Sequence, residues 1–109
     1  MPRRKKPRFV SGYPSIEAFV PKGGLQTGEI SLSLEGLEAI RLTDFEGLDQ
    51  ETAAGIMQVS RQTYGRILGE ARHLVAEALV TGKGLVVEGG TYEMRGGRQR
   101  RRRRRGGRG

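Results

Sequence analysis

The sequence predicts a mainly α-helical fold: a three-helix domain built around a helix-turn-helix, with a minor short β element and disordered basic tails. Three observations support this prediction. Residues 49–78 contain two helix starts separated by a tight turn, with apolar residues where two crossing helices must touch. Residues 33–44 carry another apolar stripe of helical spacing. Residues 95–109 contain Arg, Gly and a single Gln, which cannot bury apolar area.

Composition divides the chain into three parts. Residues 1–29 contain all four prolines and no sustained periodicity, so we predict a basic, extended arm. Residues 30–94 form the helix-turn-helix domain, with a short strand at 85–88, and residues 95–109 form a disordered Arg/Gly-rich tail. We expect part of the arm to dock on the domain because it contains several apolar residues, namely Phe9, Val10, Tyr13, Ile16, Phe19 and Val20.

The first helical signal follows a short β-favouring segment, Ile30 to Leu32. Ser33 is a candidate N-cap, and the helix should run to about Asp44. The apolar stripe of this helix is typical of a core face and consists of Leu34, Leu37, Ala39, Ile40 and Leu42. A connection follows in which Gly47 should adopt positive φ. The short strand at 85–88 pairs either with Ile30 to Leu32 or with its copy in a second subunit, and the sequence leaves both open.

The helix-turn-helix begins at Asp49, whose carboxylate is suited to cap a helix that ends near Met57. Gln58 and Val59 form the turn, and Ser60 caps a longer helix that extends to about Val80. Gln58 stands where such turns commonly use Gly, so a non-Gly residue must accept a tight turn. One face of the long helix should form core and consists of Tyr64, Ile67, Leu68, Ala71, Leu74, Val75 and Ala78.

Charge is distributed unevenly along the chain. The formal net charge is +8, of which residues 1–8 contribute +5 and residues 95–109 contribute +9, so residues 9–94 carry −6. The folded body is therefore acidic between two strongly basic ends. Such an asymmetry is typical of proteins that contact nucleic acid through tails and one local patch. Two alternatives remain. The basic cluster at Arg3 to Arg8 could serve as a solubilising end, and the tail could neutralise the acidic body.

The second helix of a helix-turn-helix enters the major groove of DNA with its amino-terminal half. We therefore predict base contacts from Arg61, Gln62, Thr63 and Arg66. An Arg side chain offers two parallel donors to guanine, and a Gln side chain matches adenine. Contacts to phosphate position the protein without specifying sequence. We predict them for Arg3, Arg4, Lys5, Lys6, Thr52, Arg72, Arg100, Arg101, Arg102, Arg103, Arg104 and Arg105.

The sequence gives little support to catalysis, metal binding or membrane association. No Cys is present and His73 is the single His, so we expect no metal site, no cofactor and no catalytic residue, and we predict that the protein is not an enzyme. Tyr64 belongs to the core face of its helix, which favours packing over stacking on a base. The sequence lacks a long apolar run and an export signal, so we expect no membrane partner and a cytoplasmic, nucleoid-associated protein.

Five motifs stand out in the chain, namely EAIRLTDFEGL at 38–48, DQETAA at 49–54, VSRQT at 59–63, EAR at 70–72 and ALVTGKGLVVEGG at 78–90. Together they resemble the bacterial and archaeal domain of unknown function 134, also called uncharacterised protein family 0251. The resemblance covers about residues 3–94 and excludes the Arg/Gly tail. Members are described as predicted DNA-binding proteins, and the motif is similar to region 4 of sigma-70-type factors, so the resemblance implies DNA binding.

We therefore expect a sequence-specific protein that binds double-stranded DNA and regulates transcription. Its recognition helix begins at Ser60 and its basic tails contact phosphates. One alternative is an RNA-binding or ribonucleoprotein-associated protein in which the Arg-rich tail is the principal binder. Another is an interaction module associated with RNA polymerase. Self-association as a homodimer is left open, because palindromic sites favour two-fold dimers but no heptad pattern demonstrates one.

Overall fold

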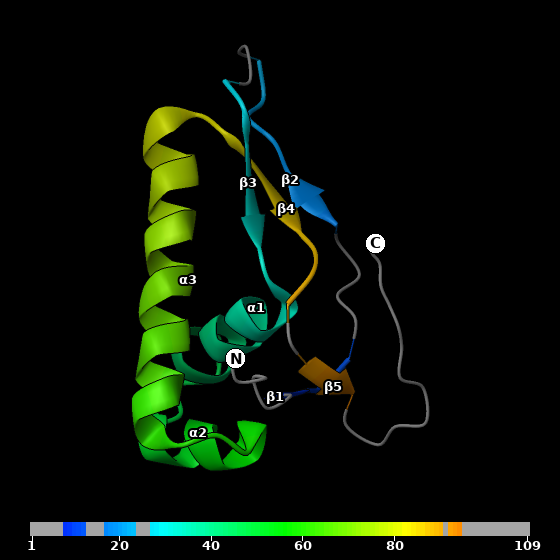
Figure 1. The fold of residues 1–109 in the computed structure, drawn as a ribbon. Coiled ribbons are helices and arrows are strands. Elements are labelled where there is room, and N and C mark those ends of the chain that lie inside the picture. Colours follow the sequence, from blue (N-terminus) through cyan, green and yellow to red (C-terminus); the bar gives the residue numbers. More distant parts are fainter. Residues whose placement is uncertain (1–7, 13–16, 24–26, 91, 95–109) are drawn as a thin grey trace, which may run out of the picture.

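The computed structural model describes residues 8–12, 17–23, 27–90 and 92–94. Three α-helices, α1 (Leu34–Ile40), α2 (Gln50–Met57) and α3 (Arg61–Thr81), pack together beside a small β region. Figure 1 shows α3 running along one side of the molecule, with α2 at its amino-terminal end and strands β3 and β4 beside its carboxyl-terminal half. The predicted mainly α-helical fold with a minor β element is confirmed.

Each helix begins at the predicted N-cap. Ser33 Oγ accepts a hydrogen bond from Gly36 N (3.0 Å), and Asp49 Oδ1 accepts one from Thr52 N (2.7 Å). Ser60 Oγ accepts one from Thr63 N (3.0 Å). These side chains satisfy amide donors that have no partner within the helix. Cap chemistry therefore places all three helix starts where the sequence predicts them.

The end of the first helix differs from the prediction. Regular α-helix stops at Ile40, and a π-helical turn, η1 (Arg41–Phe45), continues the coil, with Glu46 N donating to Arg41 O at 2.8 Å. Next to this junction, the hydroxyl of the buried Tyr64 donates to the Ala39 carbonyl (2.8 Å). The Tyr64 hydroxyl, from α3, thus donates a hydrogen bond close to the point where α1 gives way to the π-helical turn. The chain is helical to Phe45, as far as expected, but not in a single form.

Strand β4 (Gly84–Val87) is the centre of a three-stranded sheet. It pairs in parallel with β3 (Glu29–Leu32), with Ile30 opposite Leu85, and antiparallel with β2 (Ala18–Phe19). The sequence left open whether this strand pairs within the chain or between subunits, and the pairing with β3 lies within one chain. A separate parallel pair joins β1 (Arg8–Val10) to β5 (Tyr92–Met94), and neither strand is predicted by the sequence. The expected docking of part of residues 1–29 is confirmed for the buried Val10.

The hydrophobic core lies where α1, α2 and the amino-terminal half of α3 meet. Tyr64 is fully buried there, so the prediction that it packs is confirmed. The apolar faces predicted for the first and third helices are confirmed, with Leu37, Ile40, Ile67, Leu74 and Val75 half-buried. The central cluster consists of Ala39, Leu42, Ala53, Ala54, Met57, Tyr64 and Leu68.

Candidate nucleic-acid interface

A three-residue turn joins α2 to α3 and determines how α3 is presented. Gln58 adopts the left-handed conformation (φ 58°, ψ 46°) that a Gly would adopt without strain, as the sequence implied. Gln58 N donates to Gly55 O (3.1 Å), and Val59 N donates to Ala54 O (3.0 Å). The half-buried side chain of Val59 packs against the core. The turn is therefore fixed by backbone hydrogen bonds and by one apolar contact.

The first two turns of α3 carry all four residues predicted to contact bases, and three of the four are exposed. Arg61, Gln62 and Arg66 are exposed, and residues 62 and 66 are one helical turn apart and so share a face. Thr63 differs from them. It is half-buried, and its hydroxyl accepts a hydrogen bond from Ser60 Oγ (3.0 Å), which occupies it in the helix cap. The structure thus brings together Arg61, Gln62 and Arg66 and turns Thr63 toward the cap.

Ion pairing distinguishes these arginines from the other cations of the body. Among the described residues, Arg61, Arg66 and Lys22 are the basic side chains that form no ion pair. Lys22 lies in a different part of the molecule, after β2. The two unpaired arginines are therefore concentrated at one end of α3. The paired cations and their partners are Arg8 with Glu35, Arg41 with Glu38 and Glu46, Arg72 with Asp44, and Lys83 with Glu77.

Arg72, predicted as a phosphate contact, is held by the protein itself. Its Nε lies 3.1 Å and one terminal nitrogen 2.6 Å from the two carboxylate oxygens of Asp44 in η1. This two-point contact raises the pKa of Arg72 above its usual value and lowers the pKa of Asp44. The guanidinium joins the middle of α3 to η1, and its charge is already neutralised by a carboxylate.

The start of α2 presents Thr52, another predicted phosphate contact, on the exposed surface. The amide of Thr52 donates to the Asp49 carboxylate, and this backbone hydrogen bond is the main reason that the pKa of Asp49 lies below its usual value. The Thr52 side chain adds to this effect, and the nearby positive charge of Arg61 lowers the pKa further. Asp49 therefore caps α2 in its charged form beside the first arginine of α3.

Both basic ends of the chain join the body at one place. Strand β1, the first described segment, packs against α1 and α2, and Val10 lies opposite Met94 in β5. Residues 1–7 precede β1 and residues 95–109 follow β5, so both basic segments adjoin this pair of strands (Figure 1). The predicted phosphate contacts in these ends lie outside the described residues, namely Arg3, Arg4, Lys5, Lys6, Arg100, Arg101, Arg102, Arg103, Arg104 and Arg105.

Arg8, the one residue of the Arg3 to Arg8 cluster that the structure describes, is not part of a solvated end. Its side chain is buried, and one terminal nitrogen lies 3.5 Å from a carboxylate oxygen of the buried Glu35 in α1. Sequence reasoning missed this pair because both residue types are normally exposed. Ser11 donates to the buried Glu38 (2.9 Å), which also accepts from Arg41. These buried carboxylates of α1 attach the first described strand to the helices.

The described residues form neither a cluster of metal ligands nor a membrane-spanning helix. No group of three or more His, Asp or Glu side chains in that part of the chain is arranged to hold a metal ion. No helix formed by those residues has the length and apolar character needed to cross a membrane. The exposed His73 belongs to no cluster of ligands there.

Comparison with known proteins identifies relatives over most of the chain. The family model described as "Protein of unknown function DUF134" matches residues 1–95. A UPF0251 protein of Thermoanaerobacter sp. (strain X514) is 49% identical over 96 residues, which span 86% of this chain and 85% of that protein. A UPF0251 protein of Caldanaerobacter subterraneus subsp. tengcongensis is 48% identical over 98 residues, or 88% and 83% of the two chains. No solved structure matches the sequence.

Proposed function

The chain belongs to the DUF134 family, and from its interface we propose that it is a sequence-specific protein that binds double-stranded DNA and regulates transcription in the cytoplasm. In this proposal the amino-terminal half of α3 enters the major groove. The observation that carries it is that Arg61 and Arg66 are exposed and form no ion pair within the described residues, whereas Arg8, Arg41 and Arg72 each have a carboxylate partner.

An unpaired guanidinium on a helix surface is suited to base recognition. It presents parallel donors to O6 and N7 of guanine without first breaking a contact within the protein. Gln62 lies on the same face as Arg66 and has the donor and acceptor that match adenine. We propose that Arg61, Gln62 and Arg66 contact bases, and that Thr63 supports them through the Ser60 cap.

Contacts to phosphate complete the proposal. The exposed Thr52 stands at the amino terminus of α2, where amide groups and the helix dipole favour an anion. The basic ends adjoin β1 and β5, and β1 contacts α1 and α2, so we propose that their positive charges supplement the contacts made by the helices. The body itself is acidic, and affinity must therefore depend strongly on those ends and fall steeply with salt concentration.

Selection of bound sequences from unbiased pools of duplex DNA, followed by titration of the variant Arg66→Ala, tests the proposal. We expect a cognate sequence to emerge, and we expect Arg66→Ala to weaken its binding by about 1–3 kcal/mol and to relax the preference at one base pair. Lys22→Ala is the matched control, because it removes another unpaired, exposed cation that lies after β2. Equal loss on every sequence would reduce Arg66 to a phosphate contact, and failure to select any sequence would contradict the proposal.

The arginine-rich tail supports a second candidate function, in which RNA is the ligand. Residues 95–109 contain nine arginines and no acidic residue, a composition that binds phosphate in any nucleic acid. Deleting these residues separates the two candidates. If the truncated protein keeps its sequence preference and its affinity depends less steeply on salt concentration, the result favours DNA recognition by α3. If it loses all binding to nucleic acid, the result favours RNA binding by the tail.

A further inference from the structure

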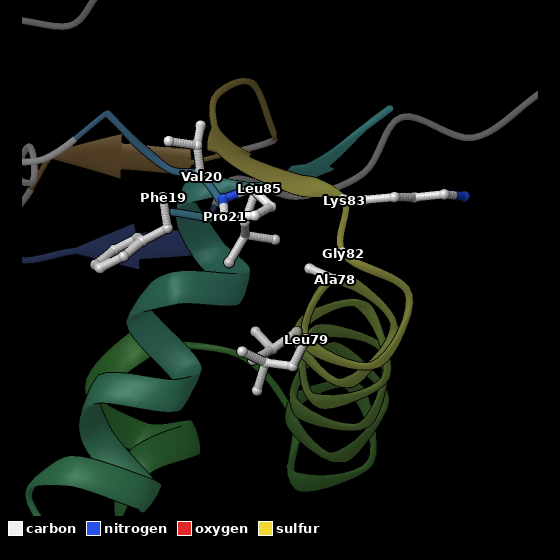
Figure 2. A pocket seen from close by; sticks show the side chains of 9 residues that line it. Phe19, Val20, Pro21, Ala78, Leu79, Gly82, Lys83 and Leu85 are labelled. Atoms are coloured by element: carbon white, nitrogen blue, oxygen red, sulfur yellow. The ribbon is translucent and has the colours of Figure 1, made fainter. Parts of the chain in front are cut away.

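The carboxyl-terminal end of α3 carries an apolar surface that DNA recognition does not use. A groove of about 420 Å³ lies between α3 and the segment containing β2. Figure 2 shows Phe19 on one wall and Leu79 on the other, with Lys83 pointing away from the groove. The lining is almost wholly apolar and consists of Phe19, Val20, Pro21, Val75, Ala78, Leu79, Gly82, Lys83 and Leu85.

Exposed apolar side chains are concentrated around this groove. Leu79 is 80% exposed and Val80 84% exposed, and on the opposite wall Phe19 and Val20 are 60% and 62% exposed. Phe45, on η1, is the other large hydrophobic side chain with high exposure among the described residues. Single exposed apolar residues are ordinary on a protein surface, whereas a contiguous group around a hollow is typical of an interaction site.

We propose that this groove is the self-association surface of the protein and that a second copy of the chain occupies it. Leu79 lines the groove and is nevertheless 80% exposed, and the neighbouring Val80 is 84% exposed outside the lining. A two-fold axis lets Leu79 of each copy pack against the groove of the other, so that the exposed apolar side chains of both copies are covered by one interface. An isologous contact of this kind needs no other partner to cover the exposed apolar area.

The charges around the groove favour a copy of the chain over an unrelated charged surface. The segments that form it, residues 17–22 and 75–85, carry Glu17, Lys22, Glu77 and Lys83, so their net charge is zero. Lys83 and Glu77 already pair with each other at 3.2 Å. Residues 9–94 as a whole carry −6, and most other surfaces of the body would therefore repel their own copy.

The position of the groove is compatible with simultaneous contact to DNA. Helix α3 contains 21 residues, so its two ends are separated by about 30 Å. Association through residues near Leu79 leaves the exposed Arg61 and Arg66 free. The inference does not depend on the proposed function, because it concerns the protein without nucleic acid.

Sedimentation equilibrium of the full chain without DNA, in salt high enough to screen the basic ends, tests the inference. We expect a mass of twice 12.0 kDa for the wild-type protein. Leu79→Glu places a charge in the interface and should weaken association at least about tenfold. Phe45→Glu is the matched control, because Phe45 is 81% exposed but lies outside the groove, and it should leave the mass unchanged.

A second measurement uses the absence of cysteine from the chain. Under mild oxidation Val80→Cys should form a disulfide-linked dimer, and Phe45→Cys should remain monomeric. A wild-type protein that stays monomeric up to about 100 µM would overturn the proposal and leave the groove to a different partner. A dimer that is insensitive to Leu79→Glu would also overturn it. Both substituted side chains are exposed, and circular dichroism checks that the variants remain folded.

Discussion

The two ends of α3 differ in both surface chemistry and support. At the amino-terminal end the exposed side chains are polar or basic, and the buried Tyr64 and Leu68 anchor the helix in the core cluster. At the carboxyl-terminal end the exposed side chains include Leu79 and Val80, and Ala78 is the buried residue of the last turn. One helix therefore presents two chemically different surfaces, and under the proposed function the better anchored end is the one that holds side chains in place for base recognition.

The largest effect should come from removing that anchor. Leu68→Ala deletes a buried side chain and should lower the free energy of unfolding by about 2–5 kcal/mol. Leu79→Ala removes the same atoms from an exposed position and should change it by less than about 0.5 kcal/mol in the monomer. Urea denaturation of both variants at low protein concentration measures the difference. Equal losses would show that the two ends are supported alike.

The helix caps allow a closer comparison, because each end of α3 has one. Ser60→Ala removes the acceptor for the Thr63 amide and should cost about 1 kcal/mol. Gly82→Ala places a side chain on a residue at φ 79°, with open space around it, and should also cost about 1 kcal/mol through conformation alone. Thermal unfolding checks both values. DNA binding should separate the two cap variants. Ser60→Ala should weaken DNA binding because it loosens the end of α3 that carries Arg61, whereas Gly82→Ala should leave DNA binding unchanged.

Acid should weaken the helix-turn-helix end first. The pKa values of Asp44 and Asp49 are depressed in the folded protein, by the guanidinium of Arg72 and by the Thr52 amide respectively. Their charged forms therefore stabilise the fold above about pH 4, the ordinary carboxyl value, and this stabilisation is lost as the pH falls through the folded-state values. Urea denaturation between pH 7 and pH 3 measures the loss. A double variant, Asp44→Asn with Asp49→Asn, should be less stable at pH 7 and show a smaller decrease in acid.

The smallest effect concerns DNA affinity rather than stability. Arg72→Ala should change affinity for a cognate site by less than about 0.5 kcal/mol, because Asp44 already neutralises Arg72. Arg66→Ala should cost several times more. Fluorescence anisotropy with both variants makes the comparison. A loss for Arg72→Ala as large as that for Arg66→Ala would mean that Arg72 exchanges its carboxylate for phosphate on binding.

Local features of this protein could be predicted from sequence, and the reason is chemical. The caps at Ser33, Asp49 and Ser60 each act within three residues, so their spacing is visible in the chain itself. The buried face of α3 follows from its helical period, and Tyr64 lies in the core as expected. The turn at Gln58 required a left-handed residue, and the structure has one there.

Features that depend on distant partners could not be predicted. Strands β1, β2 and β5 contain two or three residues each, too few for a pattern, and their partners lie more than 60 residues away in sequence. Sequence also does not show which arginines have a carboxylate partner, although this separates Arg66 from Arg72. For the same reason the sequence does not separate Arg8, which pairs with Glu35, from the other charges of the amino terminus. Nor does it show that the hydroxyl of Thr63, a predicted base contact, is engaged by the Ser60 cap.

The parallel pairing of β3 with β4 also has a consequence for folding kinetics. Residues 29–32 meet residues 84–87 only after the three intervening helices have brought both segments to one side. Contacts among helices close short loops and form early, whereas the pairing of β3 with β4 joins residues 55 positions apart, such as Glu29 and Gly84, so it has a larger entropy cost of loop closure and forms late. The helix-turn-helix should therefore assemble before the sheet. The groove, which needs β2 as one wall, should be among the last parts of the surface to appear, so that self-association would follow folding rather than compete with it.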